Sequence, residues 1–293
     1  MSRFLLPSLL LIFISPLAGT ASEESPTAAK KPEVVNSRPL IRAHAHNDYL
    51  HERPLLDALK HGFCSVEADV FLVDGKLLVA HERSELNAEQ TLDALYLDPL
   101  LERVRKNGGR VYPGGPDFTL LIDIKSDGEE TYVALDRVLA GYREMLTVVE
   151  LGVVETKAVT VIISGNRAWK RISADPTRYA GVDGRLSDLG SNRPPHLMPL
   201  VSDNWEQHFE WRGHGPMLDA EHAKLRQIVN ETHMKGRRLR FWATPDRPSP
   251  ERTALWSELL AAGVDHIGTD DLAGLQTFLL SAKDQQQPLA PVL

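Results

Sequence analysis

Short apolar runs alternate along the chain with longer stretches in which apolar residues recur every three or four positions. Short apolar runs are typical of buried strands, and the longer spacing is typical of amphipathic helices. The pattern predicts strands at residues 40–44, 64–71, 118–125, 158–164, 179–184, 197–202, 239–244 and 265–269. Helices are predicted between most of them, at residues 52–62, 94–109, 130–146, 220–236 and 250–263. Strands alternating with helices in this way predict a (β/α)₈ TIM barrel, in which the fifth strand has the weakest pattern.

The segment after the second predicted strand departs from this alternation. Residues 71–82, FLVDGKLLVAHE, carry Asp74 and Gly75 between two apolar arms. An Asp-Gly pair with apolar flanks is a strong signal for a two-residue hairpin turn. We therefore predict that the chain folds back here and brings His81 close to the end of the second strand.

The N-terminal residues have a pattern of their own. Residues 1–21 contain one basic residue, a short apolar run and then small residues, which is typical of a cleaved signal peptide. The apolar run is shorter than the roughly 18 to 20 residues of a membrane span, although an uncleaved anchor is the alternative. Residues 22–38 are polar and predict a disordered tether. Residues 39–293 then form one barrel domain of an exported protein, periplasmic or secreted, without a transmembrane span in the mature chain.

Charge and cysteine content narrow the range of partners. A formal net charge of −7 argues against a nucleic-acid partner, because binding along phosphates requires clustered Lys and Arg. The basic run KGRRLR, residues 235–240, leads into an apolar strand and is interpreted as a solvated surface. Cys64 is the single cysteine, so no disulfide forms within the chain, and its apolar neighbours predict a small buried side chain.

Polar residues at positions i and i+2 end three successive strands of the predicted barrel. They are His44 and His46, Glu67 and Asp69, and Asp123 and Lys125. In a barrel of this kind the carboxyl ends of the strands face the active site, and alternate residues on a strand share one face. We therefore expect these side chains to surround a single site.

The acidic members of this set predict a metal site. Glu67 and Asp69 share one strand face, where two carboxylates repel each other unless a cation lies between them. Asp123 follows an apolar run in the next strand and also requires a partner. Ligation by oxygen alone suits Mg²⁺ or Ca²⁺ better than Zn²⁺. The alternative is that one of these carboxylates caps or ion-pairs with a neighbouring loop.

The histidines predict proton transfer beside that metal. His81 together with His44 or His46 would place two imidazoles across one substrate. Near neutral pH, such a pair can take a proton from a nucleophile and give one to a leaving oxygen. The alternative for each histidine is a hydrogen-bonded structural role.

Other polar residues near the strand ends have two interpretations each. Lys125 either neutralises a phosphate oxygen or forms an ion pair with Asp123 or with an acidic residue of a loop. Trp242 ends the seventh strand and either lines a lipid or headgroup pocket or plugs the barrel top. Asp270 or Asp271 is expected to cap the helix that follows the eighth strand.

Several of these segments together resemble a known superfamily. AH, EADVFLVDGKLLVAHE, LLIDIK and HIGTDDL resemble the glycerophosphodiester phosphodiesterase and phosphatidylinositol-specific phospholipase C superfamily of barrel phosphodiesterases. HAHNDY, SVEADV, LYLDPLL and GVDHIGTDDL are most similar to the Altered inheritance of mitochondria protein 6 family. The resemblance runs from about residue 40 to residue 280.

The resemblance implies roles for individual residues. Glu67, Asp69 and Asp123 match the divalent-metal ligands, and His44 and His81 match the two catalytic histidines. Asn47, Lys125 and Trp242 match substrate-facing positions of the related sphingomyelinase D branch. His46 has no such match; it shares a strand face with His44 and is expected to contact the substrate's leaving group or to orient His44. Asp48 and Tyr49 are interpreted as residues that shape the loop. The chain departs from the superfamily at Ala45, which stands where the arginine of HRG helps hold phosphate, and at LHERP, which replaces PENT.

The sequence thus predicts a phosphoric diester hydrolase that depends on Mg²⁺ or Ca²⁺ and acts on a glycerophosphodiester or phospholipid-type substrate of lipid metabolism. A second hypothesis follows from His-x-His at the end of the first strand, which is also a metal signature of amidohydrolases and histidinol-phosphatase-like enzymes. A third is a non-catalytic barrel that binds a phospholipid headgroup.

Overall fold

The fold is described from a computed structural model, which covers residues 37–282 and Met1. The predicted signal peptide and most of the predicted tether lie outside the described residues, and both stay predictions. No helix within the described part of the chain is long and apolar enough to cross a bilayer.

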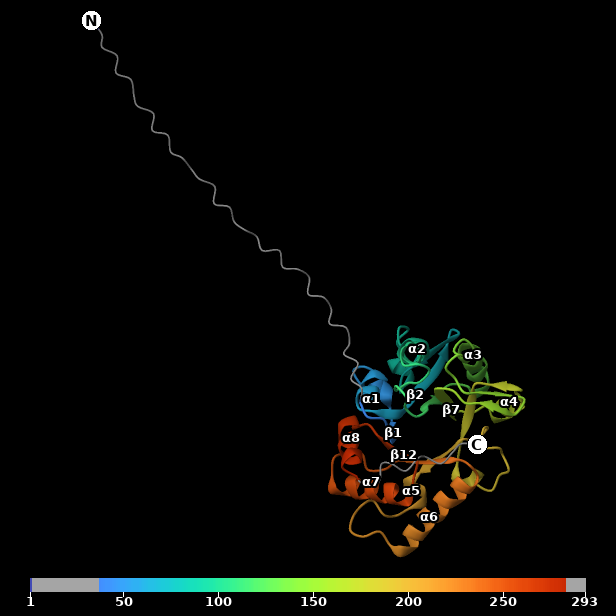
Figure 1. Cartoon of the computed structure of the whole chain (residues 1–293), viewed down its shortest axis with the longest axis vertical. Coiled ribbons are helices and arrows are strands. Elements are labelled where there is room, and N and C mark those ends of the chain that lie inside the picture. The colour runs from blue at the N-terminus through green and yellow to red at the C-terminus, as the bar shows by residue number, and fades with distance from the viewer. Residues whose placement is uncertain (2–36, 283–293) are drawn as a thin grey trace. The chain divides into compact units, whose positions relative to one another are not determined.

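Eight parallel strands form a closed barrel within residues 37–282, and helices lie around it (Figure 1). The strands follow the order β1, β12, β11, β10, β9, β7, β4 and β2, and pairing of β1 with β2 closes the ring. Their bounds are β1 Leu40–Ala45, β2 Phe63–Val73, β4 Phe118–Ile124, β7 Val159–Gly165, β9 Ala180–Gly184, β10 Leu200–Asn204, β11 Arg238–Trp242 and β12 His266–Thr269. This confirms the predicted TIM barrel, including its fifth strand, β9.

The helices connect these strands and bury their apolar faces against them. They are α1 Leu56–Lys60, α2 Asp98–Lys106, α3 Gly128–Ala140, α4 Trp169–Ala174, α5 Trp205–His208, α6 Asp219–Met234, α7 Pro250–Ala262 and α8 Leu272–Ser281. A π-helical turn at Asp93–Leu97 leads into α2, and 3₁₀ turns lie at Asp48–Leu50, Arg83–Glu85 and Leu186–Asp188. The helices α4 and α5 were not predicted, since they are too short for a helical period to show, whereas α8 is the helix expected after the eighth strand.

The predicted hairpin after the second strand is present. β3 (Lys76–Val79) runs antiparallel to β2, with Val73 paired to Lys76. Asp74 and Gly75 have φ values of 49° and 77°, the left-handed backbone that a tight hairpin turn requires. A second, small sheet of β5 (Val148–Glu150), β6 (Val153–Glu155) and β8 (Thr177–Arg178) was not predicted.

The barrel strands divide into an outer apolar face and an inner polar face. On β2, Val66, Ala68 and Val70 are buried in the main hydrophobic core, whereas Glu67 and Asp69 alternate with them. A separate apolar cluster inside the barrel consists of Leu121, Ile162 and Leu200. The alternation of side chains along a strand therefore directs the acidic residues of β2 into the barrel and its apolar residues outward, toward the helices.

The prediction for the basic run at residues 235–240 was wrong. The run was interpreted as a solvated surface, but Arg237 and Arg240 are buried. β11 begins at Arg238, so the second half of the run belongs to a barrel strand and Arg240 ion-pairs with Glu67 on β2.

Candidate active site

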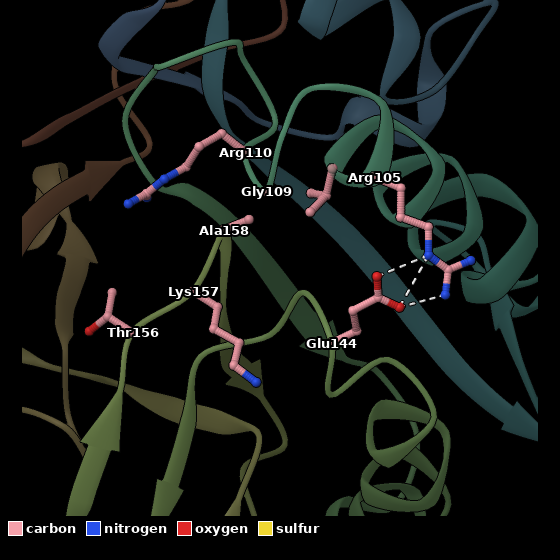
Figure 2. Close-up of a pocket in the computed structure, with 8 residues that line it drawn as sticks. Arg105, Gly109, Arg110, Glu144, Thr156, Lys157 and Ala158 are labelled. Carbon is pink, nitrogen blue, oxygen red and sulfur yellow. Dashed lines mark hydrogen bonds and ion pairs between the residues drawn. The ribbon is translucent and has the colours of Figure 1, made fainter.

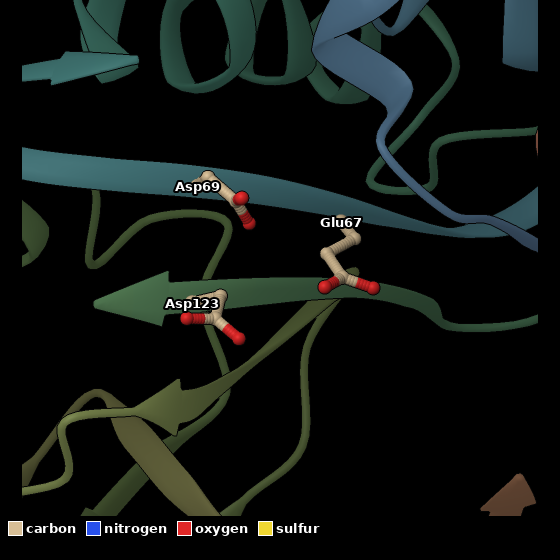
Figure 3. A group of neighbouring side chains, drawn as sticks. All are labelled: Glu67, Asp69 and Asp123. Carbon is tan, nitrogen blue, oxygen red and sulfur yellow. The ribbon is translucent and has the colours of Figure 1, made fainter. Parts of the chain in front are cut away.

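The three predicted metal ligands lie together at the carboxyl ends of β2 and β4. The parallel register makes Asp69 and Asp123 direct partners, and Glu67 lies two residues before Asp69. Their carboxylate oxygens lie within 4.8 Å of one another, and Figure 3 shows the three side chains directed into the same space. Across the described residues this is the only such group of three or more possible ligands, and neither His44 nor His46 belongs to it.

The negative charges of the three carboxylates repel one another, which shifts the pKa values of the cluster. Burial and the nearby Asp69 and Glu67 carboxylates, partly opposed by Lys125, together raise the pKa of Asp123 to about 6. Burial likewise raises the pKa of Asp69. Burial would raise the pKa of Glu67 too, but Arg240 and His44 outweigh it and hold that pKa well below its usual range. Two of the three carboxyl groups therefore hold a proton more readily than a free aspartate does.

The cluster fits a hard divalent cation. Asp69 Oδ1 is buried and has no hydrogen-bond partner among the described residues. Glu67 uses Oε2 for both His44 and Arg240, so Oε1 is available as a ligand. An all-oxygen set with one orphaned carboxylate oxygen is the chemistry that Mg²⁺ or Ca²⁺ would satisfy.

Lys125 is the cation that partly neutralises this cluster. Its Nζ lies 3.0 Å from Asp69 Oδ2 and 3.2 Å from Asp123 Oδ1. The ion-pair interpretation of Lys125 is therefore confirmed, and its predicted contact with phosphate stays a prediction. One ammonium group shared by two carboxylates leaves net negative charge at the site.

His81 lies beside the cluster, as the hairpin predicted. Its Nδ1 lies 2.9 Å from the Tyr49 hydroxyl and 3.4 Å from Asp69 Oδ2, and the side chain is 48% exposed. The Tyr49 hydroxyl also donates to Asp69 Oδ2, at 2.7 Å. Tyr49 was interpreted only as a loop residue, since a single tyrosine in a loop gives no signal of such a contact. In the structure it ties His81 to a metal-ligand candidate.

His46 is the second histidine at the barrel mouth. Its Nδ1 lies 2.8 Å from Asp270 Oδ1, and the side chain is 38% exposed. Burial lowers the pKa of His46, but the hydrogen bond to Asp270 and nearby carboxylates outweigh it, so the pKa lies above its usual value. Asp270 was expected only as a possible helix cap; Asp271 caps α8 instead, accepting from the Gly274 N–H.

Close polar contacts through Asp270, Asn47 and Tyr49 lie between the two exposed histidines. His46 Nδ1 and Asn47 Nδ2 both donate to Asp270 Oδ1, at 2.8 and 3.4 Å, and the Tyr49 hydroxyl lies 2.8 Å from Asn47 Oδ1. The Tyr49 hydroxyl also lies 2.9 Å from His81 Nδ1, so each imidazole is held through its Nδ1 atom. Each Nε2 is thereby left for a substrate.

His44 occupies a different environment. Its side chain is 1% exposed, with Nδ1 2.7 Å from Ser65 Oγ and Nε2 3.2 Å from Glu67 Oε2. Burial and the nearby Arg240 lower the pKa of His44 to about 4, against the influence of Glu67. Both ring nitrogens of this neutral imidazole are already engaged.

Two further positions complete the barrel mouth. Arg240 Nη2 lies 2.8 Å from Glu67 Oε2. The sequence indicated the inward position of Arg240 only through strand alternation, which places Arg238, Arg240 and Trp242 on one face of β11. Trp242 is 37% exposed at the end of β11, so it does not plug the barrel as a buried side chain would. Its predicted contact with substrate stays a prediction.

Gly165, at the end of β7, allows close approach to the cluster. It has φ +66°, and a Cβ atom there would lie 2.2 Å from Asp123 Oδ1. Gly165→Ala is expected to lower the free energy of unfolding by about 1–3 kcal/mol and to displace Asp123. Thermal melts with and without Mg²⁺ or Ca²⁺ should show a smaller cation-induced rise than the wild type. Gly152→Ala is the control, since its φ is +85° but no atom lies within 4 Å; an equal loss of the cation effect there would contradict the prediction.

Asp48 fixes the loop that carries Tyr49, which confirms its predicted shaping role. Its Oδ2 accepts from the Leu55 N–H and from the Tyr96 hydroxyl, at 2.5 and 2.9 Å. Burial raises the pKa of Asp48 to about 7, and these two hydrogen bonds oppose it only partly.

The raised pKa of Asp48 predicts a pH dependence of stability. Between about pH 4 and pH 7 the folded protein keeps a proton that the unfolded chain releases, so this contribution falls as pH rises through 7. From pH 5 to pH 8, the wild type should lose on the order of 2 kcal/mol more unfolding free energy than Asp48→Asn. Urea titrations at the two pH values measure this difference, and exposed Glu102→Gln should behave as the wild type. Equal losses in the wild type and Asp48→Asn would refute the prediction.

A second hollow lies at the opposite end of the barrel, formed by segments that precede β4 and β7 (Figure 2). Its basic residues all have acidic partners: Arg105 pairs with Glu144, Arg110 with Asp117, and Lys157 with Glu155. The carboxylate cluster and exposed histidines are absent from its lining. The carboxylate cluster and the exposed histidines thus lie together at the carboxyl ends of the strands.

A TIM barrel with a carboxylate cluster and histidines at this end has the architecture of the barrel phosphodiesterases. Residues 34–180 match the AIM6-like phosphodiesterase domain, and residues 238–273 match the glycerophosphoryl diester phosphodiesterase family. The first range contains the carboxylates and both exposed histidines, and the second contains Arg240 and Asp270.

Curated relatives agree with these matches. Altered inheritance of mitochondria protein 6 of Eremothecium gossypii is 32% identical over 274 residues, covering 82% of this chain and 69% of that protein. The protein of the same name in Saccharomyces cerevisiae is 30% identical, covering 87% and 72%. The homologue in Arthroderma benhamiae is 28% identical, covering 86% and 88%. The chain belongs to the AIM6-like phosphodiesterase family.

Proposed function

We propose that the protein is a metal-dependent phosphodiesterase whose proton transfers are carried out by His46 and His81. The observation that carries this is that two exposed imidazoles are each held through Nδ1 beside the carboxylate cluster, His46 by Asp270 and His81 by Tyr49. A cation-binding group flanked by two oriented imidazoles can stabilise charge and move protons in one reaction.

Glu67, Asp69 and Asp123 would hold the divalent cation. When bound, it supplies charge stabilisation to the non-bridging oxygens of the phosphoryl group. Lys125, placed between Asp69 and Asp123, would exchange part of its ion pairing for a phosphoryl oxygen of the substrate. Lys125 would thereby take up the function of the superfamily arginine that Ala45 replaces.

The two imidazoles would have opposite tasks. Asp270 holds Nδ1 of His46 and raises its pKa, which suits His46 to keep a proton on Nε2 and give it to the departing alcohol oxygen. His81, oriented by Tyr49 through Nδ1, would take a proton on Nε2 from the nucleophile. That nucleophile is water, or a hydroxyl group of the substrate that yields a cyclic phosphate.

This proposal gives His44 a different part from the sequence-based expectation. With its ring buried and both nitrogens engaged, His44 cannot reach a substrate without breaking its bonds to Ser65 and Glu67. We propose that it positions Glu67. The sequence motif alone offered no way to separate His44 from His46, because strand alternation places both on one face.

The experiment is a substrate panel for the purified protein, containing glycerophosphodiesters, lysophospholipids, sphingomyelin and phosphatidylinositol, with Mg²⁺, Ca²⁺ or a chelator. Phosphorus NMR distinguishes a monoester product from a cyclic phosphate. We expect cation-dependent cleavage of at least one glycerophosphodiester or phospholipid-type substrate. Tightly bound zinc with hydrolysis of an amide or a phosphomonoester would favour the amidohydrolase-like hypothesis. Headgroup binding without any cleavage would favour the non-catalytic barrel.

A further inference from the structure

A groove opens beside the carboxylate cluster, between the segments that follow β4 and β7. Its lining includes Lys125, Ser126, Asn166, Arg167 and Trp169. Lys125 joins the groove to the carboxylate cluster, because it lines the groove and its Nζ pairs with Asp69 and Asp123. A phosphodiester centred on the cluster would therefore extend one of its two alcohol parts into this groove.

Arg167 differs from the other arginines around the groove. Its NH1 donates to the Asp183 main-chain oxygen, at 2.5 Å, and no carboxylate of residues 37–282 lies within ion-pair distance of it. The neighbouring arginines all have acidic partners: Arg171 pairs with Glu129, Arg185 with Asp183, and Arg193 with Asp188. Within the described residues Arg167 thus makes no direct ion pair, and its charge interacts with Asp183, Asp188 and Asp123 only at longer range.

The guanidinium of Arg167 is held in place before any ligand arrives. It lies 5.7 Å from the ring centroid of Trp169, over which Arg193 also lies, at 4.5 Å. The hydrogen bond to the Asp183 main-chain oxygen uses one of the five N–H donors of Arg167. A planar guanidinium held in this way is suited to bidentate binding of a carboxylate or phosphate.

The acidic residues that line the groove are already engaged. Asp127 caps α3 by accepting from the Glu130 N–H, and Glu129 ion-pairs with Arg171. They therefore do not compete for Arg167, and Lys125 and Arg167 set the charge preference of the groove.

We propose that Arg167 is a specificity-determining residue that binds a second anionic group, a carboxylate or a phosphate, on one alcohol part of the substrate. This rests on the proposed phosphodiesterase function and narrows its substrate class to diesters with an acidic headgroup. Diesters with a neutral or cationic headgroup would leave the Arg167 charge unmatched. The hollow at the other barrel end offers no such site, since its cations are paired.

The test compares two pairs of probes that differ only in a carboxylate. In the first pair, calorimetry with Mg²⁺ present measures binding of 2-phosphoglycolate and of 2-hydroxyethyl phosphate. In the second pair, turnover is measured for the 4-nitrophenyl phosphodiesters formed at the primary hydroxyl of glycerate and of its neutral amide, which both keep a hydroxyl beside the phosphoester. The wild type should prefer the carboxylate probe by about tenfold in each pair, as for one charge-assisted hydrogen-bonded pair.

Arg167→Gln should remove this preference through Kd and KM, with kcat for the uncharged diester within about twofold of the wild type. Arg167→Lys should keep part of the preference, which shows that the effect is one of charge and not of folding. Arg226→Gln, an exposed charge on α6, is the control and should match the wild type.

An unchanged preference in Arg167→Gln, or none in the wild type, would overturn the inference. Failure of the wild type to cleave either diester would instead count against the proposed function. The calorimetric pair still decides the role of Arg167 in that case.

Discussion

Alanine at His81 or His46 is expected to lower kcat/KM for a cleaved phosphodiester by about 10²–10⁴, because each imidazole transfers a proton in the proposed mechanism. The His46 and His81 side chains are 38% and 48% exposed and contribute little apolar burial, so the melting temperature should stay close to that of the wild type. Steady-state kinetics and thermal melts on the same samples separate the two effects.

Three further variants make this test specific. His214→Ala removes another exposed histidine, one that pairs with Glu251 and not with a residue of the cluster, and should leave kinetics unchanged. Tyr49→Phe keeps the ring and removes only the hydroxyl that orients His81, so a loss smaller than that of His81→Ala is expected. Near-normal turnover in both His46→Ala and His81→Ala would refute the assignment.

His44→Ala decides between the two histidines of the opening motif. Its ring is buried and bonded to Ser65 and Glu67, so its removal should lower the melting temperature, unlike removal of His46. If His44→Ala instead abolishes turnover without loss of stability, while His46→Ala is active, the sequence-based assignment of His44 as acid or base is the correct one.

Removal of divalent cation is expected to lower activity by about 10³-fold or more, since a bound cation contributes several kcal/mol to stabilising phosphoryl charge. Added Mg²⁺ or Ca²⁺ should restore activity and raise the melting temperature of the chelated protein, because binding relieves repulsion among Glu67, Asp69 and Asp123. Activity and melting curves across a cation titration measure both effects.

Asp69→Asn and Asp123→Asn are the matching variants. Each should weaken the cation-induced rise in melting temperature, and Asp69→Asn most of all, since it changes the carboxylate whose buried Oδ1 has no partner. Glu102→Gln, an exposed carboxylate on α2, is the control. Full activity in chelator, or an undiminished cation response in both variants, would contradict a metal site at this cluster.

Much of the fold followed from the sequence because its signals are local. Apolar runs marked all eight barrel strands, and the Asp74-Gly75 pair marked the hairpin, since both depend on neighbours within a few residues. The grouping of Glu67, Asp69 and Asp123 was also predictable, because parallel strands bring equivalent ends together. Short helices such as α4 and α5 contain too few residues for the helical spacing of apolar positions to be detected.

The partners of the site residues depended on tertiary structure. Strand alternation puts His44 and His46 on one face, but only the closed barrel sets His44 against Glu67 and His46 against Asp270, 224 residues away in sequence. The basic run was misinterpreted for the same reason, since charge in a sequence does not reveal that Arg240 faces a carboxylate inside a barrel. By itself the sequence determined the barrel, the grouping of its three acidic side chains and its supply of histidines. Which histidine is buried and which faces the mouth was decided by contacts across the closed ring, because burial and charge pairing are properties of neighbours in space.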